Sequence, residues 1–211
     1  MVSGVSVVVL AAGAGSRFGG GKLVADLGGR SLIEATLDGL RGGPVDEIIV
    51  VVGSEGERLR SVSTALGDRV VENRSWAEGM STSVRAGLEA CSPGTRAAVV
   101  ALADQPLVGA EAVARLVEAF EGGAQVAVAT YEGRPRNPAL FAREVWPLLR
   151  REMSGDRGAR VSLALHPELV TEVPCDDVAH PADVDTMEDL LRLERELGAP
   201  RGGRTTGQRR T

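Results

Sequence analysis

The sequence is poor in the residues that hold small secreted domains and metal centres together. Its 211 residues include only two cysteines, Cys91 and Cys175, and two histidines, His166 and His180. No CxxC pair occurs and neither histidine has the spacing of a zinc ligand, so neither a disulfide framework nor a structural zinc site is expected. Unpaired cysteines are typical of a reducing compartment, and we expect the protein in the cytoplasm.

Aromatic residues and long apolar runs are also scarce. Aromatics make up 3% of the chain and hydrophobic residues 43%, so the core is expected to consist of valine, leucine, alanine and isoleucine. No apolar run approaches the ~20 residues of a membrane span, and no basic segment of the kind that begins a signal peptide precedes the first strand. The net charge of −5 argues against a basic face. We therefore expect neither a membrane nor a nucleic acid as partner.

Short β-branched runs alternate with helical segments along most of the chain. The expected strands cover residues 5–11, 46–53, 68–73, 96–104 and 125–130, and the expected helices 31–42, 56–66, 79–90 and 111–121. This alternation predicts an α/β domain with a mostly parallel sheet. Ligands bind such sheets beyond the carboxyl ends of the strands. The glycine-rich run near the amino terminus, Asn73 and Asp104 all follow strand ends, so we expect them at one edge.

The last third of the chain is less regular. Its expected elements are a helix over 141–153 that contains or adjoins Pro147, a turn and short helix from 155, a strand over 169–174 and a helix over 183–197. Thr186 and Asp189 have the spacing that caps the last helix. We expect residues 1–198 to form one domain. Residues 199–211, rich in glycine, arginine and threonine, have no apolar face and are predicted to be a disordered tail.

The run VVLAAGAGSRFGGGKL (Val8–Leu23) combines glycines, which let backbone approach a ligand, with two cations that suit an anion. A Walker A loop would need a glycine where Ser16 stands. It would also need a magnesium-binding hydroxyl directly after Lys22, where Leu23 stands. The run is therefore not a Walker A loop.

The same run also departs from the GxGxxG fingerprint of dinucleotide-binding proteins. Gly13 and Gly15 fit, but Phe18 occupies the third glycine position, which close packing of helix on strand requires. Successive backbone N–H groups can still form a nest around phosphates. Arg17 and Lys22 would then supply the charge, and carboxylates elsewhere would have to hold a metal ion.

This loop resembles the LAAGxGxRxGxxK signature of nucleotidyltransferases with a GT-A-like fold. Further segments resemble the molybdenum cofactor cytidylyltransferases of the MobA-like NTP transferase family: NRSWAEGMSTSVRAGL, LADQPLV, NPALFARE, GDRGAR and DVDTMEDL, in this order. The resemblance extends over residues 5–197. It implies a single Rossmann-like domain with helices on both faces of the sheet. It also implies attack of a substrate phosphate on the α-phosphorus of a nucleoside triphosphate, with pyrophosphate leaving.

The resemblance assigns roles to charged residues. Arg17 and Lys22 would neutralise the triphosphate and the transition state, and are candidate catalytic residues. Asp104, which the following Gln-Pro turn aims across the sheet edge, would bind Mg²⁺ and take part in catalysis. Asp183 and Asp185 could both face this metal, or could simply complement the dipole of the following helix. Asp185 is the expected second metal ligand.

The nucleotide would lie over the loop and the polar residues that follow. The candidate loop residues are Leu10, Ala11, Ala12, Gly13, Gly15 and Ser16. Asn73, Ser81 and Ser83 could contact the base or ribose, or could be ordinary helix caps. The LAAG form resembles that of cytidine-using relatives, and the methyl group of Ala12 crowds a purine. We therefore expect CTP rather than GTP.

The acceptor is less well specified. Many relatives have GHP where this chain has RNP, so Asn137 leaves the acceptor open. Asp156 and Arg160 could bind a phosphorylated pterin or form an ion pair that holds their turn. The expected reaction is Mg²⁺-dependent transfer of CMP from CTP to molybdopterin, with a molybdenum hydroxylase as possible receiver of the product. The alternatives are a nucleotidyltransferase that uses GTP or another acceptor, a nonenzymatic cofactor-binding accessory protein, and an NAD-type oxidoreductase.

Overall fold

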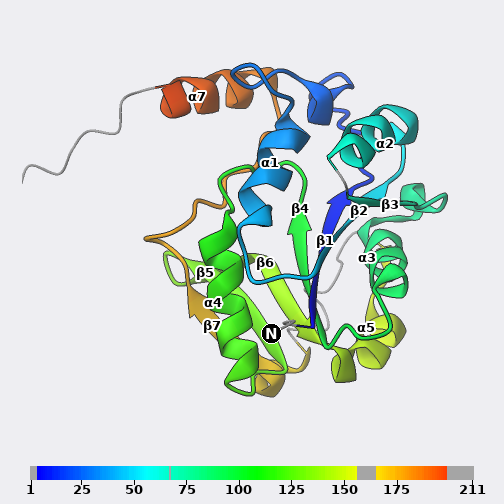
Figure 1. Cartoon of the computed structure of the whole chain (residues 1–211), viewed down its shortest axis with the longest axis vertical. Coiled ribbons are helices and arrows are strands. Elements are labelled where there is room, and N and C mark those ends of the chain that lie inside the picture. The colour runs from blue at the N-terminus through cyan, green and yellow to red at the C-terminus, as the bar shows by residue number, and fades with distance from the viewer. Residues whose placement is uncertain (1–3, 67, 156–164, 199–211) are drawn as a thin grey trace, which may run out of the picture.

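The computed structural model describes residues 4–66, 68–155 and 165–198, which form a seven-stranded sheet in the order β3-β2-β1-β4-β6-β5-β7 (Figure 1). The strands are β1 (Val5–Ala11), β2 (Glu47–Val52), β3 (Arg69–Glu72), β4 (Ala97–Leu102), β5 (Val126–Tyr131), β6 (Arg134–Ala142) and β7 (Val170–Pro174). The main helices are α1 (Leu32–Arg41), α2 (Gly56–Ala65), α3 (Met80–Ala90), α4 (Ala110–Glu121), α5 (Trp146–Glu152) and α7 (Met187–Gly198). The expected tail and the short helix after residue 155 lie outside the described residues.

The sheet is mostly parallel, as expected. β1 pairs in parallel with β2 and with β4, and β3 extends the sheet beyond β2 in the same direction. β7 pairs in parallel with β5 at the other end. The exception is β6, which runs antiparallel between β4 and β5. The carboxyl ends of β1, β2 and β4 therefore meet at one edge, together with the beginning of β6.

Strand β6 corrects the expected helix over 141–153. Phe141 belongs to the strand and pairs with Ala98 of β4 and Val126 of β5. A central strand satisfies both sides of its backbone through such pairing, which a local helical pattern cannot anticipate. The rest of the expected helix is present as a 3-10 helix over Arg143–Val145 followed by α5. Pro147 stands in the first turn of α5, where the missing N–H costs no helical hydrogen bond.

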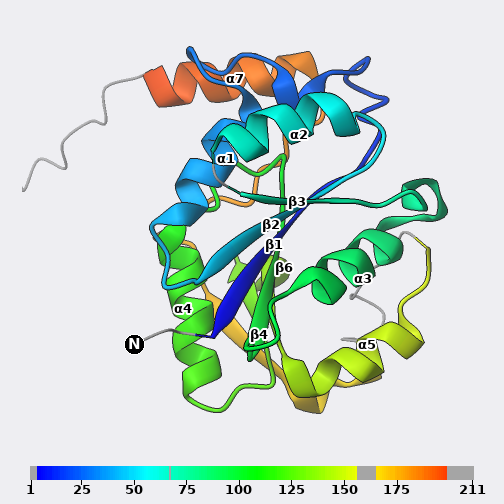
Figure 2. The same cartoon turned by 45° about the vertical axis from the view of Figure 1, so that its right-hand side comes forward.

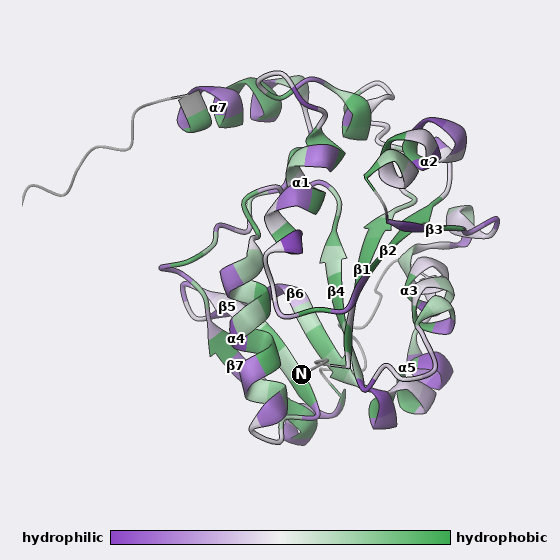
Figure 3. Ribbon diagram, in the orientation of Figure 1, coloured by the Kyte–Doolittle hydropathy of each residue, from purple (hydrophilic) through white to green (hydrophobic). Residues whose placement is uncertain are grey.

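Helices cover both faces of the sheet, as the resemblance implied (Figure 2). Along β1, Val7 and Val9 face the core shared with α1, α2, α4 and α7. Val8 points to the opposite side and joins the core formed with α3 and α5. Figure 3 shows hydrophobic residues along the strands and hydrophilic residues on the outer sides of the helices. The parallel strands are thus buried on both faces, which explains their continuous apolar runs.

Two helix starts follow their sequence signals. The Ser31 hydroxyl accepts from the backbone N–H of Glu34, and the Glu34 carboxylate accepts from Ser31 in return. At α7 the Asp189 carboxylate accepts from Thr186, whose hydroxyl accepts from the backbone N–H of Asp189. These capping boxes fix where each helix begins. In the described part of the chain, every helix is too short or too polar to cross a bilayer.

Candidate functional site

A cavity of about 470 Å³ opens at the carboxyl ends of β1 and β4. Its walls come from the loop after β1, the region before α3 and the end of β4. The lining residues are Leu10, Ala11, Ala12, Gly13, Ala14, Gly15, Ser16, Lys22, Leu23, Trp76, Ala77, Met80, Ser83, Leu102, Ala103 and Asp104. The glycine-rich loop and Asp104 therefore meet at one edge, as expected, although Lys22 and Asp104 are 82 residues apart in the sequence.

The backbone of the loop explains its glycines. Gly15, Gly19, Gly20 and Gly21 have φ values of 57°, 89°, 93° and 68°, in the left-handed region that side chains disfavour. Gly13 is not required by its backbone conformation or by a close contact. A Cβ built on it would meet no atom within 4 Å, so its backbone faces open space. Phe18 packs against the core. The loop is therefore anchored by an apolar side chain where a dinucleotide fingerprint would need glycine, and it presents bare backbone to the cavity at Gly13.

The cations and carboxylates form one ion-pair network. The Lys22 Nζ atom lies 2.6 Å from Asp104 Oδ2 and 3.5 Å from Asp185 Oδ1. Arg17 pairs with the other oxygen of Asp185. The Lys22 and Asp104 side chains are only 13% and 21% exposed, so this part of the network is poorly hydrated, whereas Arg17 is 76% exposed. The fold thus brings together Arg17, Lys22, Asp104 and Asp185, the four residues expected to face the triphosphate and the metal.

The segment before α7 is tied to the turn after β4. The backbone N–H of Val184 donates to the Asp104 carbonyl at 3.0 Å. The buried Gln105 amide donates to Asp183 Oδ1 at 2.7 Å and to the Pro181 carbonyl at 3.2 Å. These bonds hold Asp185 beside Asp104. No local sequence signal marks this role of Gln105, because its partners lie 76 and 78 residues further along the chain.

Asp183 is oriented differently from Asp185. Its carboxylate faces the Gln105 amide, and neither Arg17 nor Lys22 forms an ion pair with it. The pKa of Asp183 is raised from its ordinary value, first by desolvation among neighbouring protein atoms and then by the negative charge of Asp104. Asp183 is nevertheless an exposed residue, so only part of its hydration is lost. Asp185 lies outside the cavity lining but shares Lys22 with Asp104, so the geometry favours Asp185 over Asp183 as the partner of Asp104.

Asn73 organises the wall near α3. Its buried amide nitrogen donates to Thr82 Oγ1 at 2.8 Å and to Ser83 Oγ at 2.9 Å. Its amide oxygen accepts from the backbone N–H of Ser75. Ser83 lines the cavity, whereas Asn73 and the buried Ser81 are outside its lining. Asn73 thus positions Ser83 and the turn between β3 and α3.

Trp76 and Met80 add apolar surface that the sequence analysis did not single out. Trp76 packs so closely on the end of β2 that a Cβ on Gly53 would lie 2.8 Å from it. Both residues lie shortly after a predicted strand end, which was the available signal. A cavity with polar backbone on one wall and an aromatic residue on another is typical of small-molecule sites.

The expected acceptor residues are placed only in part. Asn137 belongs to β6, outside the cavity lining, two residues before Ala139, which pairs with Val100. Because β6 is antiparallel to β4, Asn137 lies toward the same sheet edge as Asp104. Asp156 and Arg160 lie outside the described residues.

The donor set suits a divalent cation that arrives with a ligand. Across residues 4–66, 68–155 and 165–198, no group of three or more His, Cys, Asp or Glu side chains could by itself hold a metal ion. Asp104 and Asp185, however, converge on a single ammonium group. Mg²⁺ is commonly held by one or two carboxylates together with substrate phosphates. The two aspartates fit that mode of binding. In the ligand-free protein the Lys22 ammonium group lies between their carboxylates, where the cation would otherwise bind.

Comparison with known proteins agrees with this geometry. The family model of the MobA-like NTP transferase domain matches residues 7–171. Nicotine blue oxidoreductase from Paenarthrobacter nicotinovorans is 33% identical over 197 residues, which cover 90% of this chain and 96% of that protein.

Two solved structures show the same fold. The Mycobacterium sp. strain JC1 homologue of Mycobacterium tuberculosis Rv0371c is 31% identical with a TM-score of 0.74, and the match covers 93% of this chain and 98% of that one. Rv0371c of M. tuberculosis H37Rv, solved as a complex with manganese, is 27% identical with a TM-score of 0.74, over 90% and 98% of the two chains.

Proposed function

Because the chain belongs to the MobA-like NTP transferase family, we propose that it transfers CMP from CTP to molybdopterin, with Mg²⁺ as cofactor and pyrophosphate as second product. The observation that carries this proposal is the cavity at the β1 and β4 ends, where bare loop backbone faces a cation held between two carboxylates. A triphosphate needs both kinds of group, because its reaction is limited by charge that must be positioned and neutralised.

The charged residues would act by exchanging partners. Bound Mg²⁺ would supply charge neutralisation between the triphosphate and the carboxylates of Asp104 and Asp185. Lys22 and Arg17, which those carboxylates now hold, would then donate to phosphate oxygens. The backbone from Ala12 to Ser16 would lie against the nucleotide, as its place in the cavity lining suggests. The manganese complex of Rv0371c supports a divalent metal in this fold.

The far wall would receive the base and ribose. The Asn73 amide donates to Ser83 Oγ, which leaves the hydroxyl hydrogen of Ser83 free to donate to a base acceptor in the cavity. Ala12 is buried and carries the methyl group that would crowd a purine. These two features favour CTP over GTP.

The acceptor would enter from the β6 side. Asn137 stands near the sheet edge there, and we assign it to acceptor binding together with Asp156 and Arg160 of the GDRGAR segment. A molybdenum hydroxylase would receive the dinucleotide product. We expect these steps in the cytoplasm.

A nucleotide panel with molybdenum-loaded molybdopterin tests the proposal. Pyrophosphate release should be fastest with CTP and Mg²⁺, and Asp104→Asn should reduce it by at least about 100-fold, because the loss of one electrostatic contact at a reacting phosphate has that scale. Asp38→Asn removes a charge on the exposed side of α1 and should leave the rate unchanged. If pyrophosphate release is fastest with GTP, the nucleotide substrate is GTP and not CTP. If no triphosphate gives release, the proposed transferase activity is refuted. If the protein shows no turnover and Asp104→Asn still delivers cofactor as well as the wild type, the protein is instead a nonenzymatic accessory protein.

The similarity to nicotine blue oxidoreductase favours a second candidate, a redox enzyme. Among redox enzymes, the sequence offers an NAD-type oxidoreductase as the alternative. Phe18, packed against the core at the third fingerprint position, opposes it. The same purified protein should be tested for oxidation of NADH and NADPH with a dye acceptor. Turnover there, with no pyrophosphate release in the panel, would decide for the redox reaction.

A further inference from the structure

The turn between β2 and α2 contacts both ends of the glycine-rich loop. At the first end, Ser54 Oγ donates to the Gly13 carbonyl at 3.0 Å. At the last end, the backbone N–H of Gly21 donates to Glu55 Oε1 at 2.5 Å. Gly53 allows this approach, because a Cβ there would lie 2.6 Å from the Ala12 carbonyl oxygen. Neither Ser54 nor Glu55 lines the cavity.

The loop needs such an external support. Gly19, Gly20 and Gly21 are consecutive and all have positive φ, and glycine loses more conformational freedom on ordering than any other residue. Lys22, which lines the cavity, comes directly after them. The bonds within the loop near these glycines are long, at 3.3 Å from Gly19 to the Ser16 carbonyl and 3.4 Å from Gly20 to the Gly15 carbonyl. The bond from the Gly21 N–H to the Glu55 carboxylate is shorter, and it is of the stronger, charge-assisted kind.

The direction of the Glu55 contact distinguishes support from competition. A carboxylate inside the cavity would occupy a donor meant for phosphate and would oppose nucleotide binding. Glu55 instead belongs to the lining of a separate hollow formed by residues 53–58, Arg60 and Glu72. The Gly21 N–H therefore faces α2, while Lys22 next to it faces the nucleotide cavity.

We propose that Glu55 is a positioning residue, which with Ser54 clasps the glycine-rich loop from outside the cavity and so holds Lys22 in place for the nucleotide. This inference rests on the proposed nucleotide site for its consequence in binding. The clasp itself is a property of the ligand-free protein and is tested there as well. Glu55 stands at the N-cap of α2 without forming a side-chain cap bond, so its replacement removes no cap.

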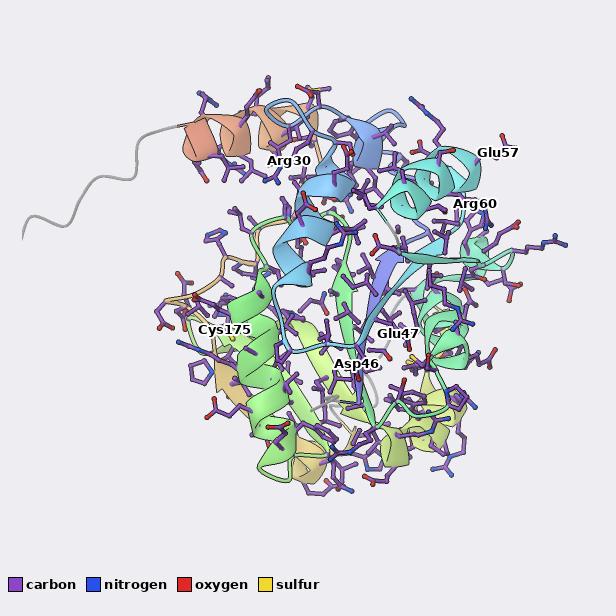
Figure 4. The ribbon with its side chains drawn as sticks, viewed as in Figure 1. Arg30, Asp46, Glu47, Glu57, Arg60 and Cys175 are labelled. Carbon is purple, nitrogen blue, oxygen red and sulfur yellow. The ribbon has the colours of Figure 1, made fainter. Side chains whose placement is uncertain are left out.

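The test compares Glu55→Ala, Glu55→Gln and Glu57→Ala in the full-length protein. Glu57 lies in the first turn of the same helix and is exposed, so Glu57→Ala is the matched control for lost charge (Figure 4). The first measurement is the rate of trypsin cleavage after Arg17 and Lys22 without ligand, since proteolysis follows the population of open loop. The second is kcat and KM for each triphosphate, with melting temperatures to confirm folding.

Glu55→Ala should raise loop cleavage about fivefold and KM for the nucleotide about tenfold, which corresponds to about 1.4 kcal/mol. It should leave kcat within about twofold. The free-energy cost of ordering the loop falls on the binding step, and the loop is ordered once the nucleotide is bound. Glu55→Gln keeps an amide oxygen that accepts from Gly21 and should restore both values. If Glu55→Ala does not fold, Ser54→Ala tests the other end of the clasp by the same cleavage assay.

Two outcomes would overturn the clasp. The first is a cleavage rate of Glu55→Ala equal to that of Glu57→Ala, which would show that the carboxylate does not order the loop. The second is a lower KM in Glu55→Ala, which would make Glu55 a competitor of phosphate. If the wild-type protein releases no pyrophosphate with any triphosphate, the proposed function fails, while the cleavage comparison still decides for or against the clasp.

Discussion

Lys22 reaches two carboxylates that come from distant parts of the chain. In the ligand-free protein the Lys22 ammonium group neutralises both Asp104 and Asp185, and its pair with Asp104 is poorly hydrated. In the proposed function, a divalent cation would therefore compete with Lys22 for the same oxygens unless a triphosphate offered the ammonium group a new partner. Metal and nucleotide are then expected to bind more tightly together than either binds alone.

Lys22→Met tests this competition. Removal of the ammonium group should lower the Kd for Mn²⁺ alone about tenfold, or about 1.4 kcal/mol, and should weaken binding of nucleotide in the presence of metal. Isothermal titration calorimetry measures both. Arg30→Met, which removes a cation paired with Asp38 on the protein surface (Figure 4), should change neither value. Unchanged Mn²⁺ affinity in Lys22→Met would contradict the competition.

At the scale of elements, the position of α3 depends on a glycine. A Cβ built on Gly87 would lie 2.2 Å from Val8 Cγ1 of β1 and 3.1 Å from Val51 Cγ2 of β2. Helix α3 can therefore approach the sheet this closely only because Gly87 carries no side chain. Because α3 carries Ser83 and Met80 to the cavity, this close contact also sets the width of the site.

Gly87→Ala should destabilise the protein by about 1–3 kcal/mol, since an added methyl group forces the helix or the strands to shift. It should also raise KM for the nucleotide, because Ser83 moves with the helix. Gly94→Ala is the control, as a Cβ at Gly94 meets nothing within 4 Å. Urea unfolding measures the difference. Equal stability of the two variants would show that α3 yields to the methyl group without cost.

At the scale of the whole molecule, Glu47, labelled in Figure 4, ties several segments together. It is the first residue of β2 and so lies at the end of the parallel strands opposite the cavity. Its carboxylate accepts from Ser6 Oγ at 2.7 Å and from the backbone N–H and the hydroxyl of Ser92 at 2.8 and 3.0 Å. Desolvation opposes ionisation, but the hydrogen bonds from Ser92 and Ser6 outweigh it. The pKa of Glu47 is consequently lowered from its ordinary value of 4.5.

A carboxyl whose pKa is lower in the folded than in the unfolded state stabilises the fold above its unfolded pKa, and this stability is lost as the pH falls through the folded pKa. The free energy of unfolding should therefore fall on acidification below about pH 4.5. Glu47→Gln should lower the free energy of unfolding by about 1 kcal/mol at pH 7. The free energy of unfolding of this variant should also fall less steeply on acidification. Urea titrations of both proteins at pH 7 and at several acidic values give the two slopes. Parallel curves would contradict this role of Glu47.

Much of the fold could be predicted because its signals are local. The apolar run from Val5 to Ala11 and the capping box of Ser31 and Glu34 each depend on neighbours in the chain, and the structure has both. Strand β6 could not be predicted in this way. Its first residues are polar or proline, and the strand exists because β4 and β5 supply hydrogen-bond partners on its two sides.

The sequence by itself determined an α/β chain, its family, and which charged residues gather at one sheet edge, because strand ends and glycine positions are written in local order. Only the tertiary structure decided that Lys22 bridges Asp104 and Asp185, that Gln105 holds the segment before α7, and that Glu55 reaches Gly21. Each of these contacts joins segments that are distant in the chain. Their geometry depends on how the sheet orders its strands, which no local pattern encodes.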